Sequence, residues 1–260
     1  MVKKYADLYV ETCRALCARE DRETATLMTR NLLCKHIGLP LEVILTNREQ
    51  YASDEVCLGI AESVSRLLKG EPLAYVLGEW DFYGMTLQVD PSVLIPRDDT
   101  CAVTDLAIQQ AMFLDDTPRI LDLCTGSGCI GLAIAKRVKD ARVTLADISR
   151  EAIAVAKKNI KNQKQTGHVS CVQVDALEPA PAFLGKFDLI VSNPPYITTG
   201  EMEELDASVK NFEPHLALHG GDDGLDFYRA IARNYREALK PGGYLCLSSA
   251  WDREMLSARF

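Results

Sequence analysis

The chain has 260 residues, of which 47% are hydrophobic and 25% charged, proportions typical of a globular protein with one large domain or two smaller ones. Its formal net charge of −8 and pI of about 5.1 exclude the overall basic field that attracts nucleic acids or anionic lipids. The first residues lack the apolar core of a signal peptide and no apolar run approaches transmembrane length, so we expect a cytoplasmic protein without a membrane partner.

Cysteine and histidine are spaced without a metal-binding pattern. The nine cysteines include no C-x-x-C pair, and the four histidines show no H-E-x-x-H spacing. Scattered cysteines in or beside apolar runs are typical of buried, reduced thiols. We therefore expect free thiols and no metal site.

Residues 1–78 have the pattern of helices. In the segment SDEVCLGIAESVSRLLKG, apolar residues recur at helical spacing. Ser53 or Asp54 can cap the start of this helix, and Gly70 with Pro72 ends it. An earlier apolar pattern is expected to stop at Gly38. These features predict a small helical domain that serves packing or recognition.

Residues 79–100 are expected to form a linker, in which TLQVD and SVLIP pair as a hairpin around Pro91. From residue 101 to residue 260, short apolar runs alternate with helical patterns. The expected strands are RILDLC, VTLAD, VSCVQVD, FDLIVSN and GYLCLSS. Such alternation predicts an α/β fold, a doubly wound parallel sheet that binds ligands at the carboxyl ends of its strands.

A glycine-rich turn follows the first of these strands. Gly126, Gly128 and Gly131 match G-x-G-x-x-G, and Asp147 ends the next strand. This pattern fits a nicotinamide dinucleotide, and it also fits a tight turn without a ligand. Asp122 favours a cationic ligand instead, because a carboxylate repels a pyrophosphate. S-adenosylmethionine offers a ribose to Asp147 and an ammonium group that Asp122 can meet directly or through water.

Asp175 and Ala176 end the third strand. They are placed to border an adenine ring, with Asp175 accepting a hydrogen bond from the exocyclic amine. The alternative is that Asp175 is a solvated acid at a strand end.

The segment VSNPPYI runs an apolar strand into an asparagine and two prolines. Prolines end the strand and stiffen the tip, so Asn193 presents its amide, with Tyr196 behind it. The Asn193 side-chain oxygen and the Pro194 carbonyl can hold the two N–H groups of an acceptor amide or amine. This arrangement directs the nitrogen lone pair at a donor methyl group, and Tyr196 can pack on the planar acceptor. An ordinary strand-ending turn is the alternative.

At this point the chain resembles the protein-(glutamine-N5) methyltransferases that modify peptide-chain release factors, the PrmC/HemK family. The resemblance rests on PLAYVLGEWDFYG, LIPRDDT, ILDLCTGSGCIGLA, SNPPYI and FEPHLALHGGDDGLDFYR. It implies a methyltransferase sheet preceded by a helical domain that recognises the protein substrate. It also implies S-adenosylmethionine as cofactor and the Gly-Gly-Gln loop of class 1 peptide-chain release factors as target.

The resemblance also assigns residues to the two expected sites. The cofactor is expected at Cys124, Thr125, Gly126, Ser127, Gly128, Asp147, Asp175, Ala176 and Asn193. The acceptor glutamine is expected at Asn193, Pro194, Pro195 and Tyr196, of which Asn193, Pro194 and Tyr196 are the expected catalytic residues.

The chain departs from the family pattern at three places. Asp98 and Cys101 replace a proline and a glutamate, and Ser248 stands where a glutamate usually follows the fifth strand. The chain ends at Phe260, where the family continues through two more strands. We therefore expect a shortened methyltransferase domain whose fifth strand has an open edge, lower stability and a tendency to self-associate. Four apolar residues close to helical spacing, Trp251, Met255, Leu256 and Phe260, are expected to cover part of that edge.

Three other functions compete with this interpretation. Adenine-N6 methyltransferases of nucleic acids use a similar Asn/Asp-Pro-Pro-Tyr tip on a flipped base. The segment GEMEELDASVK after the tip is acidic, whereas phosphate binding requires lysine and arginine, so a protein substrate is favoured. A dinucleotide-dependent oxidoreductase leaves the tip unexplained. A shortened methyltransferase that only binds its ligands, or turns over weakly, is the third alternative.

Overall fold

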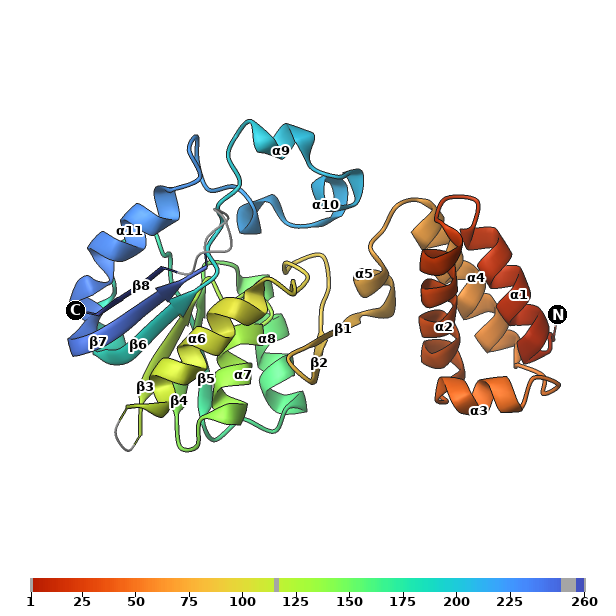
Figure 1. The fold of residues 1–260 in the computed structure, drawn as a ribbon, viewed down its shortest axis with the longest axis horizontal. Helices are drawn as coiled ribbons and strands as arrows, with labels where there is room; N and C mark the ends of the chain where they lie inside the picture. Colours follow the sequence, from red (N-terminus) through yellow and green to blue (C-terminus); the bar gives the residue numbers. More distant parts are fainter. Residues whose placement is uncertain (1, 115–116, 249–255, 260) are drawn as a thin grey trace. The chain divides into compact units, whose positions relative to one another are not determined.

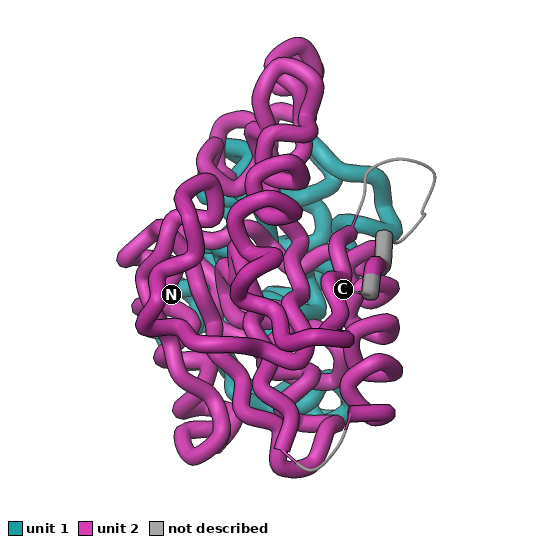
Figure 2. Tube along the Cα trace, turned by 90° about the vertical axis from the view of Figure 1, so that its left-hand side faces the viewer, with its two compact units in different colours: residues 1–78 teal, residues 79–260 magenta. Residues whose placement is uncertain are grey.

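The computed structural model describes residues 2–114, 117–248 and 256–259. The chain divides into two compact units, residues 1–78 and residues 79–260, each with its own hydrophobic core (Figure 2). No helix in the described part of the chain has the length and apolar character needed to cross a lipid bilayer.

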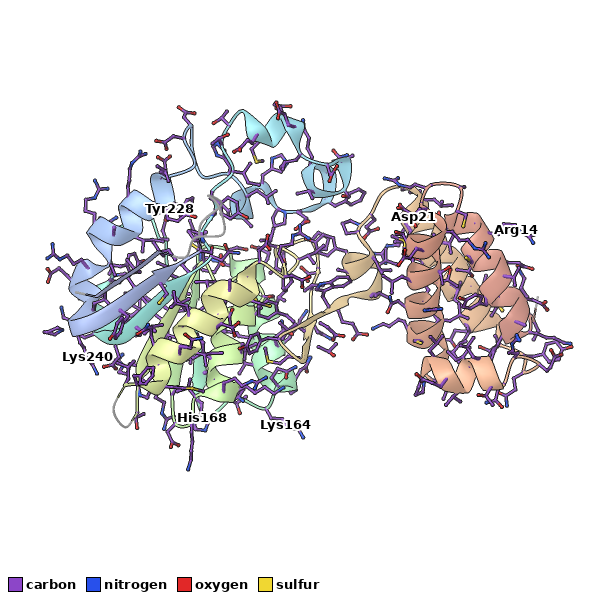
Figure 3. The ribbon with its side chains drawn as sticks, viewed as in Figure 1. Arg14, Asp21, Lys164, His168, Tyr228 and Lys240 are labelled. Carbon is purple, nitrogen blue, oxygen red and sulfur yellow. The ribbon has the colours of Figure 1, made fainter. Side chains whose placement is uncertain are left out.

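The first unit is helical. Its helices are α1 (Tyr5–Leu16), α2 (Arg22–Ile37), α3 (Leu41–Thr46), α4 (Asp54–Leu68) and α5 (Leu73–Leu77). The predicted cap of α4 is confirmed, because the Ser53 hydroxyl accepts a hydrogen bond from Val56 N–H at 3.2 Å. The predicted stop of α2 is also confirmed, since Gly38 adopts a left-handed conformation with φ of +74°. Asp21, labelled in Figure 3, caps the start of α2 by accepting from two backbone N–H groups.

The second unit begins with a hairpin of β1 (Glu79–Phe82) and β2 (Met85–Gln88). The prediction that SVLIP supplies one of the two strands was wrong. Tyr83 and Gly84 have φ of +53° and +71°, which suits a two-residue turn between antiparallel strands. After Pro91 the chain turns instead of extending, because the Asp90 carboxylate accepts from Ser92 N–H at 2.9 Å.

A six-stranded sheet forms the centre of the second unit (Figure 1). Its strands are β3 (Arg119–Leu123), β4 (Arg142–Asp147), β5 (Val169–Gln173), β6 (Phe187–Ser192), β7 (Leu239–Leu247) and β8 (Leu256–Arg259). Their order is β5-β4-β3-β6-β7-β8, and the first five are parallel. The predicted doubly wound sheet is confirmed, with the strand order reversing between β3 and β6.

Helices cover both faces of this sheet. They are α6 (Thr100–Met112), α7 (Cys129–Arg137), α8 (Arg150–Asn162) and α11 (Asp226–Asn234). Two short helices, α9 (Glu201–Glu204) and α10 (Ala207–Phe212), belong to the segment between β6 and α11. Residues of α6, α7 and α8 share one buried cluster with the strands, whereas α11 belongs to the cluster on the other face. Neighbouring strand residues divide between these clusters, as Ile120 and Leu121 do, which follows from the two-residue period of a strand.

The end of the chain differs from the prediction. The edge of β7 is not open, because β8 pairs with it in antiparallel register, from Leu247 opposite Leu256 to Tyr244 opposite Arg259. Leu256 therefore lies in a strand and not in a helix. Pairing satisfies the backbone N–H and C=O groups that an edge strand exposes, which a short helix cannot do. Trp251, Met255 and Phe260, which were also expected in the covering helix, lie outside the described residues.

Candidate active site

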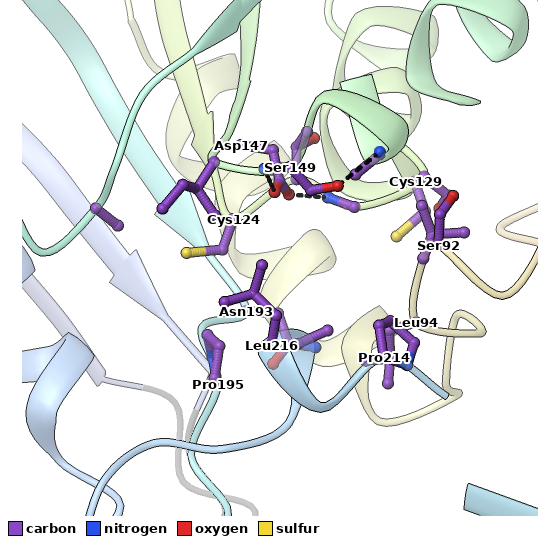
Figure 4. Close-up of a pocket in the computed structure, with 18 of the residues that line it drawn as sticks. Ser92, Leu94, Cys124, Cys129, Asp147, Ser149, Asn193, Pro195, Pro214 and Leu216 are labelled. Carbon is purple, nitrogen blue, oxygen red and sulfur yellow. Dashed lines mark hydrogen bonds between the residues drawn. The ribbon is translucent and has the colours of Figure 1, made fainter. Parts of the chain in front are cut away.

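A cavity of about 350 Å³ opens at the carboxyl ends of the parallel strands. Its lining comes from residues between Ser92 and Phe227, all of the second unit (Figure 4). Nine of the residues predicted for the two sites line it. They are Cys124, Thr125, Gly126, Ser127, Asp147, Asp175, Ala176, Asn193 and Pro195. The fold thus brings together residues from Cys124 to Pro195, which are distant in the sequence, at the place where the strand order reverses.

Asp147 joins the glycine-rich turn to the end of β4. Its carboxylate oxygens accept hydrogen bonds from Gly126 N–H at 2.8 Å and from Ser149 N–H at 3.0 Å. Thr125 N–H donates to the Ala146 carbonyl at 3.0 Å, which holds the turn against the same strand. Burial raises the pKa of Asp147, while the backbone N–H donors act in the opposite direction. A carboxylate has about four acceptor positions, so Asp147 keeps capacity for ligand hydroxyls.

Gly128 was predicted to bind the cofactor, but it is not among the described residues that line the cavity. A Cβ atom at this position would lie 2.9 Å from Leu145 Cδ1, and its φ of +85° is unfavourable for other residues. At Gly131 a Cβ would lie 2.2 Å from Leu145 Cδ2. Both glycines therefore let α7 pack closely on β4.

Asp122, which the sequence places near a cationic ligand, is held beneath the glycine-rich turn by its hydrogen bonds to that turn and to α7. It is fully buried and is not part of the cavity lining formed by described residues. Its Oδ2 accepts from the Thr125 hydroxyl at 2.6 Å and from Gly131 N–H at 2.8 Å. Its Oδ1 is buried without a hydrogen-bond partner in the described chain. Burial raises the pKa of Asp122 to about 7. Because it accepts hydrogen bonds from Thr125 and Gly131, Asp122 supports the turn from beneath.

The N-P-P-Y turn directly follows β6. Asn193 and Pro195 line the cavity, whereas Pro194 is buried and Tyr196 is half-buried, both outside the lining defined by the described residues. Burial raises the pKa of Tyr196, with Asp99 adding to the shift. Its phenol is therefore neutral at physiological pH.

A glycine-rich segment packs against the back of this turn. Ile197 N–H donates to the Leu218 carbonyl and Gly220 N–H donates to the Ile197 carbonyl, both at 2.9 Å. A Cβ atom on Gly220 would lie 2.6 Å from Tyr196 Cα, and one on Gly224 would lie 2.3 Å from the Tyr196 carbonyl oxygen. Gly220 and Gly224 of the sequence HGGDDG are thus explained by contact with the N-P-P-Y backbone, a role that the sequence alone did not reveal.

The Asn193 side chain is hydrogen-bonded at both ends. Its Oδ1 accepts from the Ser248 hydroxyl, and its Nδ2 donates to Thr100 Oγ1 at 3.3 Å. Thr100 also lines the cavity. Thr100 was not predicted as a site residue, because a threonine at the start of a helix carries no sequence signal of such a role.

Two loops complete the cavity with apolar side chains. Leu94 and Pro96 come from the segment before α6, and Pro214 and Leu216 come from the segment after α10. The buried carboxylate of Glu213 joins the two segments, because it accepts from Ile95 N–H at 3.2 Å and pairs with the Arg97 guanidinium. No sequence pattern indicated this pair, since its members are more than a hundred positions apart.

The charges around the cavity are negative. Asp147, Glu151 and Asp175 contribute carboxylates, and the described residues of the lining include no lysine or arginine. Such a site repels a pyrophosphate and suits a cationic ligand with hydroxyl groups. This electrostatic pattern disfavours the dinucleotide that the glycine turn alone allowed.

Both units of the chain match known protein families. Residues 8–78 match the family described as PrmC N-terminal domain, and residues 104–213 match the family described as Methyltransferase small domain. The release factor glutamine methyltransferase of Chlorobaculum tepidum is 43% identical over 262 residues, covering 96% of this chain and 89% of that protein. The corresponding protein of Geobacter sulfurreducens is 40% identical over 234 residues, covering 89% and 79%. The chain therefore belongs to the family of release factor glutamine methyltransferases.

Proposed function

We propose that this methyltransferase transfers the methyl group of S-adenosylmethionine to the side-chain amide nitrogen of the glutamine in the Gly-Gly-Gln loop of class 1 release factors. The names of its relatives support the substrate. The observation that carries the chemistry is the carboxamide of Asn193, which lies on the lining of a cavity with acidic and apolar walls. Release factors act in the cytoplasm, which is the compartment that the sequence predicts for this chain.

The residues present fit the cofactor. A volume of about 350 Å³ lies within the range of ligand pockets, roughly 300–1,000 Å³. Asp147 would accept from the ribose hydroxyls, Asp175 and Ala176 would border the adenine, and the turn from Cys124 to Ser127 would approach the ligand closely. The acidic lining favours the positive charges of this cofactor. When bound, it supplies an electrophilic methyl group on a sulfonium.

An amide nitrogen is a poor nucleophile because its lone pair is delocalised into the carbonyl, and Asn193 compensates for this. In this proposal the Asn193 side-chain oxygen accepts one N–H of the substrate amide and the Pro194 carbonyl accepts the other, although Pro194 is not among the described residues that line the cavity. Two such acceptors orient the nitrogen and stabilise the positive charge that grows on it, an effect concentrated in the transition state. Pro195 and the apolar loop residues limit water around the reacting amide.

An adenine base carries a similar exocyclic amine, so methylation of a nucleic acid is the alternative function. The charge near the site distinguishes the two substrates. Phosphate recognition depends on lysine and arginine close to the site. Here the segment after the turn carries Glu201, Glu203 and Glu204 on α9, all in contact with solvent, and Lys210 is paired with Glu203. This charge supports a protein substrate.

The acceptor can be identified after incubation with S-adenosylmethionine by mass spectrometry of the peptides of the release factor and of the nucleosides of the nucleic acids. The acceptors to compare are a class 1 release factor, the same factor with the loop glutamine changed to alanine, duplex DNA and RNA. We expect one added methyl group on the loop glutamine of the unaltered factor and on none of the other acceptors. Methylated adenine in DNA or RNA, with an unmodified release factor, would overturn the proposal.

A further inference from the structure

We infer that Thr100 and Ser248 are positioning residues, which hold the Asn193 carboxamide from its two ends and so set the plane in which it meets the acceptor amide. This inference rests on the proposed function. The carboxamide receives the Ser248 hydroxyl at Oδ1 and donates from Nδ2 to Thr100 Oγ1 at 3.3 Å. The three residues come from different elements: the start of α6, the end of β6 and the end of β7.

Without partners, the carboxamide of an asparagine rotates easily. The terminal torsion of this side chain has broad, roughly two-fold minima, so rotation moves the oxygen without a large energy barrier. Two hydrogen bonds at opposite ends restrict this torsion. The oxygen has two lone pairs, and because Ser248 occupies one, one remains for an N–H of the substrate.

Both holding groups are fixed by their own contacts. Thr100 is only 4% exposed, its N–H donates to the Arg97 carbonyl at 3.0 Å, and its carbonyl accepts from the Thr104 hydroxyl at 2.8 Å. These contacts anchor it at the first turn of α6.

Ser248 is held by the sheet and by α11. Its N–H donates to the Ser192 carbonyl at 3.1 Å, and its carbonyl accepts from the Tyr228 hydroxyl at 2.7 Å. Tyr228, labelled in Figure 3, belongs to α11. Ser192 immediately precedes Asn193. Ser248 therefore forms hydrogen bonds with both the backbone of Ser192 and the side chain of Asn193 at the end of β6.

The test uses four variants of the full chain that separate the hydroxyl groups from the shape of the side chains. Thr100→Val and Ser248→Ala remove one hydroxyl each, while Thr100→Ser and Ser248→Thr keep it. We expect the first pair to lower kcat on the release factor roughly fivefold to tenfold, as loss of one neutral hydrogen bond predicts, with the cofactor Kd within about twofold of wild type. The second pair should retain most of kcat.

A readout that does not need turnover accompanies the kinetics. The side-chain N–H resonances of Asn193 in ¹⁵N spectra, assigned by their loss in Asn193→Ala, should shift in Thr100→Val and Ser248→Ala. They should stay near their wild-type positions in Thr100→Ser and Ser248→Thr. Unshifted resonances in the first pair would overturn the inference, whatever the activity.

The kinetic outcomes distinguish this inference from the proposed function. If Asn193→Ala is inactive while Thr100→Val and Ser248→Ala keep the wild-type kcat, the positioning role is wrong and the proposed function stands. If the wild-type protein does not methylate the release factor, the proposed function fails, and the resonances alone decide the positioning role. A loss of kcat that is equal in Thr100→Val and Thr100→Ser would also contradict the inference, because the hydroxyl would then be irrelevant.

Discussion

Two carboxylates at the ends of neighbouring strands differ in what surrounds them. Asp147 lines the cavity, and both of its oxygens accept backbone N–H groups of the adjoining loops. Asp122 is fully buried beneath the same turn, and one of its oxygens has no hydrogen-bond partner among the described residues. Asp147 is therefore suited to binding a ligand, and Asp122 to shaping the turn that binds it.

Asp147→Ala should weaken the binding of S-adenosylmethionine and of its demethylated product at least tenfold. The change removes a charged acceptor, and hydrogen bonds to charged groups contribute about 1.5–3 kcal/mol each. It also removes the partner of the Gly126 and Ser149 N–H groups, which loosens the turn. Isothermal calorimetry measures the effect, with Glu178→Ala as a control that removes the same charge at an exposed position. Equal affinities for wild type and Asp147→Ala would show that the ribose lies elsewhere.

Asp122 predicts a pH dependence of stability. Its pKa rises from 3.8 to about 7 on folding because of burial, so the folded chain holds this proton more tightly than the unfolded chain. The resulting stabilisation is complete below about pH 4 and is lost as the pH rises through 7. Asp122→Asn keeps the shape and does not titrate. Its stability relative to wild type should therefore increase by about 2.5 kcal/mol between pH 5 and pH 8.

Denaturant unfolding of both proteins without ligand measures this difference. Because the two proteins share every other titrating group, the difference isolates Asp122. A stability difference that stays constant from pH 5 to pH 8 would mean that Asp122 titrates at its ordinary value in the folded protein.

At the scale of elements, the N-P-P-Y turn is held by the loop behind it. Gly220 leaves no room for a side chain, since an added Cβ atom would lie 2.6 Å from Tyr196 Cα and 2.7 Å from the Pro195 carbonyl oxygen. Both contacts are with backbone, which cannot move aside as a flexible side chain can. The position of the turn and the packing of the loop are therefore coupled.

Gly220→Ala should lower the free energy of unfolding by about 1–3 kcal/mol, the usual cost of overpacking, and should reduce methyl transfer more than cofactor binding. The reason is that the added methyl group displaces the acceptor site and not the ribose site. Gly167→Ala is the matched control, because a Cβ atom there meets nothing within 4 Å. Thermal melts and single-turnover rates for the two variants check the prediction. Similar stability and rates in both would refute the coupling.

The elements that sequence reasoning found share a strong local signal. The strands around the glycine turn and the N-P-P-Y turn are apolar runs with clear ends, and α4 has both an apolar stripe and a capping serine. The hairpin was misplaced because its turn, at Tyr83 and Gly84, carries only a weak sequence signal. The covering of β7 by β8 was missed because a short segment gains more from pairing with an edge than from its own helical pattern.

The candidate site was predicted to the extent that its residues follow strands. Asp147, Asp175 and Asn193 each stand at or just after the end of a strand, so topology alone brings them together. The pair of Arg97 with Glu213, and the contact of Thr100 with Asn193, join loops and helix starts that are far apart in the chain. Such contacts leave no local pattern, because they depend on how finished elements pack.

In the molecule as a whole, the cavity belongs to the second unit. Its lining residues, among those that the structure describes, lie between Ser92 and Phe227, and the unit has a core of its own. The first unit has a separate core and matches the PrmC N-terminal domain. Binding of the cofactor and recognition of the protein substrate are therefore expected to be separable.

A chain of residues 79–260 should bind S-adenosylmethionine within about threefold of the affinity of the full chain, because no lining residue is removed. Methyl transfer to the release factor should fall by more than tenfold, since the helical unit is expected to help recognise that substrate. Calorimetry and labelling measure the two effects, and a cooperative thermal melt establishes that the shorter chain is folded. A folded 79–260 chain without cofactor affinity would contradict the placement of the site in this unit.

Asn193 is proposed to hold the acceptor amide, and single-turnover methyl transfer with Asn193→Ala is the decisive measurement of this role. The enzyme is saturated with radiolabelled S-adenosylmethionine, mixed with excess release factor and sampled over time, with Asn162→Ala as the control at an exposed asparagine. For Asn193→Ala we expect a rate at least a hundredfold below wild type, with the cofactor Kd changed by no more than a few fold, because the lost hydrogen bond matters most in the transition state. Transfer to the release-factor glutamine at the wild-type rate by Asn193→Ala would contradict it.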